Sequence, residues 1–169
     1  MRNLSLIVAV LMLLACSPSH SQELETSSQA NANEASLKAL SGEWGLVNLS
    51  CASGKPISGL AATVLGFKST VLSIRNNMLG ISMETGPCSM ETFNTFKIDG
   101  RQLVYAGGKI ATIRTCEGHL SKVEQGISGQ SADSFSIRGD RLTLRAPATG
   151  VVCPRGDTTI STYLRLFKA

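Results

Sequence analysis

The chain of 169 residues is 43% hydrophobic but only 5% aromatic, and its 16 basic and 12 acidic residues give a net charge of +4. This length fits one ordinary domain with short additional segments. Proteins that bind nucleic acids interleave basic residues with aromatic stacking platforms, which this composition lacks, so no nucleic-acid partner is expected.

The N-terminal segment begins with one basic residue, Arg2, and continues as an almost uninterrupted apolar run from Leu4 to Leu14. The run is too short for a membrane span, which needs ~20 apolar residues. A charged start, a short apolar stretch and a small residue, Ala15, before the cleavage site are typical of a secretory signal. We therefore predict that residues 1–15 form a cleaved signal peptide.

The end of this segment, Leu13-Leu14-Ala15-Cys16, resembles the lipobox of bacterial lipoprotein precursors. The resemblance implies that Cys16 is acylated, becomes the new N-terminus and holds the protein on a membrane. Several acyl chains on one residue anchor more firmly than a single chain. Ser17 follows the cysteine, where inner-membrane retention usually involves Asp. The expected location is therefore the bacterial cell envelope, at the outer membrane facing the periplasm.

Residues 16–36 are rich in Ser, Gln, Asn, Ala and Glu, and Leu24 is their only large aliphatic residue. A segment of this composition cannot bury enough apolar surface to fold by itself. We predict a flexible tether that reaches roughly 25 Å, the root-mean-square length of about 20 flexible residues. The folded domain is then expected over residues 37–169, a length that supports its own core.

The domain shows an apolar and polar alternation of period two, interrupted by turn signals at short intervals. This pattern predicts antiparallel strands joined by hairpins. Tight turns are expected at Asn76-Asn77, Asp99-Gly100 and Gly139-Asp140, whose residues tolerate positive φ. The predicted strands are Glu43–Cys51, Thr70–Arg75, Met78–Glu84, Glu91–Ile98, Arg101–Ala106, Lys109–Cys116, Asp133–Arg138, Arg141–Ala146 and Thr158–Lys168.

Short helices are predicted only at Ala35–Leu40 and Leu120–Gln125. Many hairpin strands need pairing or closure to remove their edges. The expected fold class is mainly β, a small antiparallel β-barrel or strongly curled sheet with one or two short helices. The predicted core face consists of the alternating apolar residues Leu72, Ile74, Leu79, Ile81, Met83, Phe135, Ile137, Leu142, Leu144, Ile160, Leu164 and Leu166.

Besides Cys16, the mature chain has four cysteines, Cys51, Cys88, Cys116 and Cys153. An even number of cysteines in an oxidising compartment predicts two structural disulfides. A metal site would need close ligand pairs such as Cys-x-x-Cys, which are missing, so no metal is expected. Three connectivities are open. A simple up-and-down count of strands favours a pairing of Cys51 with Cys88.

The inventory for catalysis is thin. His119 is the only histidine of the domain, and no Gly-x-Ser-x-Gly elbow accompanies it. Gly107-Gly108-Lys109 lacks the further glycine that a phosphate loop needs, because Leu103 occupies that position, and a hairpin turn is predicted there instead. We therefore expect no enzyme and no cofactor. Carboxylates that a glycan hydrolase could use, but that charged strand edges also explain, are Glu84, Glu91, Glu117 and Glu124.

Several short motifs fall in a familiar order along the domain: Gly86-Pro87-Cys88, the run from Phe96 to Leu103, and Thr112-Ile113-Arg114-Thr115-Cys116. Glu124 lies eight residues beyond the second cysteine, and Gly139-Asp140-Arg141-Leu142-Thr143-Leu144 supplies a late Gly-Asp-x-Leu-x-Leu. Together they resemble the META domain of the HslJ-type bacterial lipoproteins. That resemblance implies a small antiparallel β fold.

The opening Gly42-Glu43-Trp44 also matches the Gly-x-Trp start of lipocalin-like barrels, which makes a lipocalin-like domain the alternative. The chain departs from the META pattern at Ser89, where that family has Asn, and at the intruding Pro87. The META resemblance favours a disulfide between Cys88 and Cys116, which leaves Cys51 for Cys153.

The META resemblance implies a non-catalytic envelope lipoprotein that supports envelope integrity or stress tolerance. The alternatives are a lipocalin-like small-ligand binder and an inhibitor of an envelope hydrolase. Residues 101–169 contain ten basic and five acidic residues, and such a basic half attracts anionic surfaces. Beyond the membrane contact through Cys16, the expected partners are an envelope protein or an anionic glycolipid, and the expected state is a monomer.

Overall fold

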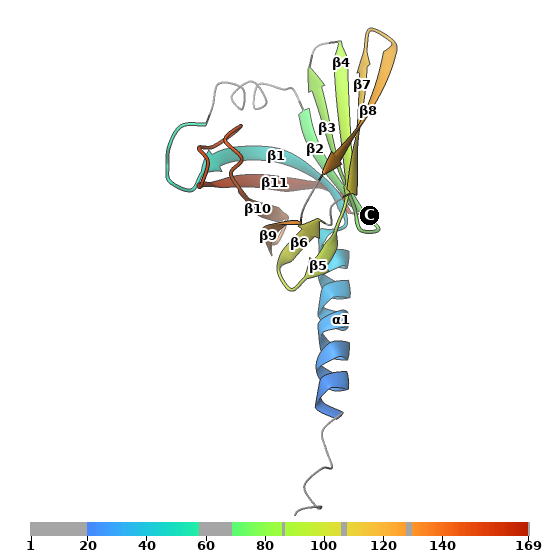
Figure 1. Ribbon diagram of the computed structural model, residues 1–169, viewed down its shortest axis with the longest axis vertical. Coiled ribbons are helices and arrows are strands. Elements are labelled where there is room, and N and C mark those ends of the chain that lie inside the picture. Colours follow the sequence, from blue (N-terminus) through green and yellow to red (C-terminus); the bar gives the residue numbers. More distant parts are fainter. Residues whose placement is uncertain (1–19, 58–68, 86, 106–107, 128–129, 169) are drawn as a thin grey trace, which may run out of the picture.

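The computed structural model describes residues 20–57, 69–85, 87–105, 108–127 and 130–168. One helix, α1 (His20–Leu40), precedes a single antiparallel sheet that curls into a half-barrel (Figure 1). Its strands are β1 (Gly42–Cys51), β2 (Ser69–Arg75), β3 (Met78–Thr85), β4 (Cys88–Thr95), β5 (Lys97–Asp99), β6 (Gln102–Tyr105), β7 (Gly108–Cys116), β8 (His119–Ile127), β9 (Ser131–Arg138), β10 (Arg141–Pro147) and β11 (Thr158–Lys168).

The strand order across the sheet is β5-β6-β9-β10-β11-β1-β2-β3-β4-β7-β8. The chain therefore leaves β4 in one half of the sheet and continues as β5 at the far edge, with Phe96 buried at the crossing. It then returns as β7 to lie beside β4. Of the two shapes predicted, the strongly curled sheet is the one observed. The expectation of a mainly β fold is confirmed.

The predicted strands agree with the observed ones except in two places. The predicted strand Glu91–Ile98 is divided at Phe96 into β4 and β5, because the chain turns there into the other half of the sheet. The predicted helix Leu120–Gln125 is wrong, because this segment forms β8 and pairs with β7 over nine residues. Tertiary pairing overrides the local preference once a turn with positive φ at Glu117 and Gly118 directs the chain back along β7.

The predicted turns are largely observed. Asn76 and Asn77 have φ values of 48° and 63°, which is the geometry of the turn that best matches strand twist. The turn predicted at Asp99-Gly100 lies one residue further on, because Asp99 pairs with Gln102. The hairpin predicted at Gly107-Gly108 is wrong: β6 pairs with β5 and β9, whereas β7 pairs with β4 and β8, and Gly107 itself lies outside the described residues.

The core lies on one face of the sheet, which we call the inner face. Trp44, at the start of β1, is fully buried, and its Nε1 donates a hydrogen bond of 2.8 Å to the carbonyl oxygen of Leu40 at the end of α1. The guanidinium of Arg165 stacks on the indole at 3.9 Å from the ring centre. The buried apolar set consists of Leu40, Trp44, Leu72, Ile74, Leu79, Phe96, Leu103, Tyr105, Phe135, Leu142, Leu144 and Tyr163.

The predicted core face is wrong for β11. Leu164 and Leu166 are 40% and 48% exposed on the opposite, outer face of the sheet, whereas Tyr163 is buried. The pairing register decides this, since Tyr163 lies opposite Leu142, whose side chain is in the core. Both faces of β11 carry large side chains, so its alternation alone was ambiguous. For β2, β3, β9 and β10 the predicted core residues other than Met83 are buried or packed against the core, and Met83 is half-buried.

The segment predicted as a flexible tether is helical from His20 onward, as part of α1. Its Glu, Gln, Ala and Lys residues are good helix formers, so low hydrophobicity excluded a buried face but not a helix. The last turn is held by Ser41, whose Oγ donates to the carbonyl oxygen of Leu37. No helix in the described ranges is both long and apolar enough to cross a bilayer. Cys16 and the predicted signal peptide lie outside the described residues.

Two disulfides connect the strands. Cys51 bonds to Cys153, with Cα atoms 5.6 Å apart, and Cys88 bonds to Cys116, with Cα atoms 4.1 Å apart. This is the pairing that the META resemblance favours. The strand count, which favoured Cys51 with Cys88, is wrong because β5 and β6 lie at the far edge. Cys88 and Cys116 therefore become direct neighbours across β4 and β7.

Candidate binding groove on the outer face

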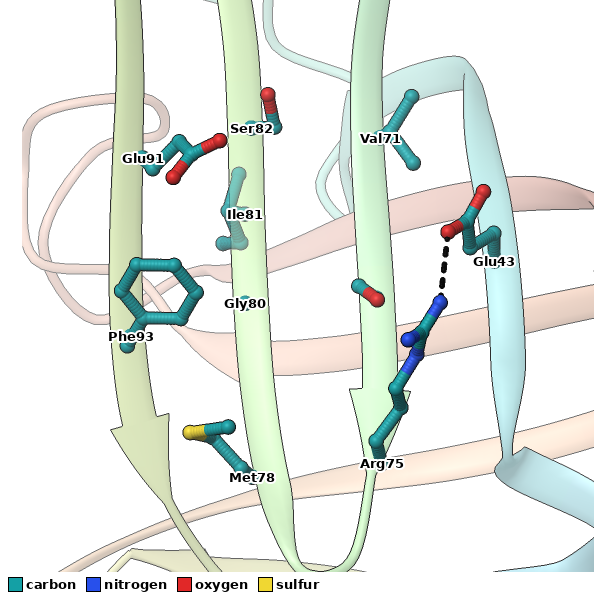
Figure 2. Close-up of a pocket in the computed structure, with 10 residues that line it drawn as sticks. Glu43, Val71, Arg75, Met78, Gly80, Ile81, Ser82, Glu91 and Phe93 are labelled. Carbon is teal, nitrogen blue, oxygen red and sulfur yellow. Dashed lines mark hydrogen bonds and ion pairs between the residues drawn. The ribbon is translucent and has the colours of Figure 1, made fainter. Parts of the chain in front are cut away.

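The outer face of β1 to β4 carries a groove of about 490 Å³. Side chains alternate along a strand, so Val71, Ser73 and Arg75 of β2 point outward while Leu72 and Ile74 point into the core. Figure 2 shows these outward side chains on neighbouring strands. The outward-facing lining residues are Glu43 of β1, Val71, Ser73 and Arg75 of β2, Met78, Gly80 and Ser82 of β3, and Glu91 and Phe93 of β4. Ile81 of β3 also borders the groove, although its side chain packs against the core on the inner face.

Gly80 shapes the floor of the groove. It pairs directly with Phe93, whose ring leans over it, so that a Cβ at this position would lie 3.1 Å from the ring atom Cε1. A larger residue here would push the ring away from the backbone by a few tenths of an ångström, so glycine permits its close approach. The ring thus forms one apolar wall low against the sheet, and Val71 and Met78 extend the apolar surface (Figure 2).

Charged groups border this apolar floor. Arg75 Nη2 lies 3.1 Å from Glu43 Oε1, and their side chains are 63% and 33% exposed. An ion pair this exposed contributes little to stability, so its main consequence is to place one acidic and one basic group at the rim of the groove. Glu91 stands on the other side, next to Ser82 (Figure 2). The groove has the size and the apolar-with-few-polar character of ligand sites.

The acidic residues and the histidine that the sequence analysis considered for catalysis do not lie together in the structure. Glu84, Glu91 and Glu124 occupy the outer face of three different strands, β3, β4 and β8, as the strand registers require. Glu117 is in the β7–β8 turn, and His119 is exposed at the start of β8. Only Glu91 reaches the groove. Over the described part of the chain, no three His, Cys, Asp or Glu side chains gather in a metal-binding arrangement.

Three arginines from the basic C-terminal half of the sequence lie on the outer face of the sheet. Arg138 and Arg141 lie directly opposite each other across β9 and β10, and Arg145 points to the same face; all three are exposed. Like charges directly opposite in a sheet repel each other, and a bound anion would relieve that repulsion. Arg165 differs, because it donates to the carbonyl oxygens of Ala39 and Ser41.

One polar cluster on the inner face was missed by sequence reasoning. Tyr105 donates a hydrogen bond of 3.1 Å from its hydroxyl to Asp133 Oδ2. Burial raises the pKa of Asp133, an effect that this hydrogen bond partly offsets, and burial also raises the pKa of Tyr105. Burial raises the pKa of Tyr163 to about 12. The signal was present, since Asp133 shares its strand face with Phe135 and Ile137.

Comparison of the chain with protein-family models, with curated proteins and with solved structures found no match. The groove and the arginine pair are therefore interpreted from their own geometry.

Proposed function

We propose that this protein is a non-catalytic lipoprotein of the bacterial cell envelope, anchored in the outer membrane through Cys16. It acts by contact, binding an extended segment of an envelope protein in the outer-face groove. The lipobox-like Leu13-Leu14-Ala15-Cys16 supports the anchor. The groove, an apolar floor between the Glu43–Arg75 ion pair and Glu91, is the observation that carries the binding role.

The inner face is a poor alternative for a ligand. Trp44, Leu72 and Leu142 are fully buried there, so side chains fill the region where a lipocalin-like barrel would hold its cargo. A ligand inside would have to displace these packed side chains, at a cost of several kcal/mol for each. The groove needs no such rearrangement, because its residues already face solvent between rigid, paired strands.

The shape of the groove favours an extended peptide. It runs across neighbouring strands, so a bound chain would lay one or two apolar side chains between Val71 and Phe93. The rim groups would fix its orientation, with a basic residue near Glu91 and an acidic one near Arg75. A partner held this way on a membrane-anchored domain would support envelope integrity and stress tolerance, the role implied by the META resemblance.

A complementation experiment tests this proposal. Deletion of the gene should lower tolerance of a membrane-active detergent, and the wild-type gene should restore it. Cys16→Ala should fail to restore tolerance because the protein leaves the membrane fraction. Ser82→Trp, which places a large ring in the groove, should also fail. The matched control, Thr143→Trp, makes a comparable change at a half-buried outer-face position of β10 outside the groove and should restore tolerance.

Several outcomes would contradict the proposal. Full restoration by Ser82→Trp would show that the groove is not used, provided that circular dichroism shows both tryptophan variants folded. Unchanged membrane association of Cys16→Ala would exclude the lipid anchor. A peptidoglycan- or ester-cleaving activity that disappears in Glu91→Gln, without unfolding, would show that the protein is an enzyme.

A further inference from the structure

The two edges of the sheet differ in how they are protected. At one edge, β5 has three residues and packs beside α1, where Gly100 donates its backbone N–H to Asn33 Oδ1 at 3.3 Å. At the other edge, β8 has nine residues and pairs only with β7 among the described strands (Figure 1). Long exposed edge strands are templates for pairing with another chain, and proteins normally shorten or cover them.

The side chains of β8 also favour pairing at this edge. Leu120 and Val123 are 70% and 60% exposed, and they point to opposite faces of the strand. Both faces of the edge thus present apolar surface to solvent. Pairing of this edge with another strand would bury part of both side chains and add cross-strand contacts.

The backbone of β8 is aligned for pairing. The two-residue turn at Glu117 and Gly118 makes Cys116 and His119 a hydrogen-bonded pair across β7 and β8. In an antiparallel ladder such pairs alternate with pairs that make no hydrogen bond to each other. Alternate residues from Leu120 to Gly126 therefore turn their backbone N–H and C=O groups away from β7, toward the open edge.

We propose that β8 pairs antiparallel with β8 of a second copy of this chain, about a two-fold axis at Val123. In this register Lys122 lies opposite Glu124 of the partner subunit, and the reciprocal pair forms on the other side of the axis. The two Val123 side chains meet at the centre. This inference goes beyond the groove and does not rest on it, and it replaces the monomer expected from the sequence.

The charges of Lys122 and Glu124 determine which partner strand fits the β8 edge and in which register it pairs. Within one chain Lys122 Nζ lies 2.9 Å from Glu124 Oε1, with the two side chains 55% and 42% exposed, so both remain accessible to a partner. Moving the axis by one residue would place Lys122 opposite Lys122, or Glu124 opposite Glu124. Like charges directly opposite are destabilising, and only the axis at Val123 pairs each lysine with a glutamate. A strand complementary to itself in this way fits the isologous interface of a two-fold dimer.

A cysteine cross-linking experiment in the intact, membrane-associated protein tests the dimer. Residues facing each other in a pair without mutual hydrogen bonds have Cα atoms about 4.5 Å apart, within disulfide range. Val123→Cys should therefore form a disulfide-linked dimer on a non-reducing gel. Leu120→Cys is the matched control, because this residue is at least as exposed but lies roughly 20 Å from its symmetry mate, six residues along the ladder. It should remain at least tenfold less cross-linked.

Charge reversal tests the register. In the Val123→Cys background, Lys122→Glu alone should lower the dimer fraction several-fold, since two acidic side chains then face each other. The double change Lys122→Glu with Glu124→Lys restores opposite charges and should restore the dimer fraction. Failure of the double variant to restore it would overturn the register.

Three results would overturn the second copy as occupant. Equal cross-linking of Val123→Cys and Leu120→Cys would indicate random collisions. Cross-linking of neither would show that β8 stays unpaired by its own kind. Cross-linking of Val123→Cys to a different protein would assign the edge to a foreign strand. Both cysteine substitutions are at exposed positions, and near-UV circular dichroism of each variant would establish that the fold is retained.

Discussion

Two regions of the same sheet differ in how deeply their side chains are buried. We call β1, β2, β3, β5, β6, β9, β10 and β11 the packed half and β4, β7 and β8 the extended half; in Figure 1 the strands of the extended half, together with β2 and β3, project away from α1. The packed half contains side chains with no exposed surface, including Trp44, Leu72 and Leu142. The extended half has no fully buried side chain among its described residues. It is therefore stabilised by its hydrogen-bond ladder, cross-strand pairs and the Cys88–Cys116 disulfide.

The contrast explains where binding is proposed. A strand that gives one face to a core has only the other face for contacts, and its register is set by packing. The strands of the extended half keep both faces and one edge accessible. The edge strand β8 belongs wholly to this half, whereas the groove lies across both halves and takes only Glu91 and Phe93 from β4.

Removal of a disulfide should have the largest effect on stability, and removing each disulfide in turn tests the two halves separately. The chain-entropy account gives about 4.7 kcal/mol for the Cys51–Cys153 loop and about 3.6 kcal/mol for the Cys88–Cys116 loop. We expect Cys51→Ser with Cys153→Ser to lower the free energy of unfolding more than Cys88→Ser with Cys116→Ser, as measured by denaturant titration. The reverse order would show that the extended half depends on its disulfide more than loop length predicts. Peptide mapping that found Cys51 joined to Cys88 would contradict the pairing itself.

Truncation of one aromatic residue in each half compares burial directly. Trp44→Ala removes a fully buried indole together with its hydrogen bond to Leu40, and should cost about 3–5 kcal/mol. Phe93→Ala, at a half-buried position, should cost about 1 kcal/mol. Unfolding should be followed by far-UV circular dichroism, because Trp44 is the only tryptophan of the chain. Equal costs would refute the division into a packed and an extended half.

The smallest expected effect concerns the Asp133 carboxyl inside the packed half. Burial holds the pKa of Asp133 above its ordinary value. A carboxyl with a raised folded-state pKa stabilises the fold below its unfolded pKa, about 3.9, and this stability is lost as pH rises through the folded value. Relative to Asp133→Asn, the wild-type free energy of unfolding should therefore fall as the pH rises from about 3 toward neutrality.

Asp157 provides a control of opposite sign. A hydrogen bond from the hydroxyl of Ser53 and one from the backbone of Thr158 hold its pKa below the ordinary value. Relative to Asp157→Asn, wild-type stability should rise over the same pH interval, because a lowered carboxyl pKa stabilises the fold above the unfolded value. Denaturant titrations at several pH values measure both differences, and identical slopes would contradict the burial of Asp133.

The sequence was sufficient wherever a local rule applied. Period-two alternation located β2, β3, β9 and β10 with their core residues, and Asn76-Asn77 marked its hairpin because few residues tolerate positive φ. The same rules failed where the local sequence was compatible with two different structures. β11 carries large side chains on both faces, and only pairing of Tyr163 with Leu142 placed Leu166 outside. The predicted helix at Leu120 failed because pairing with β7 prevailed over local preference.

The candidate site was only partly accessible from sequence. Glu91 was singled out as a carboxylate, but nothing local indicated that Gly80 and Phe93 would form a groove with it, since that depends on the β3–β4 register. The sequence by itself was sufficient for the mainly β class, for most of the turns and for the expectation of two disulfides, whereas the signal peptide and the lipobox-like motif stay predictions because they lie outside the described residues. Strand order, the neighbours of Cys88 and the open edge at β8 were decided by the tertiary structure alone. They depend on contacts between residues far apart in the chain, and no short window contains both members of such a pair.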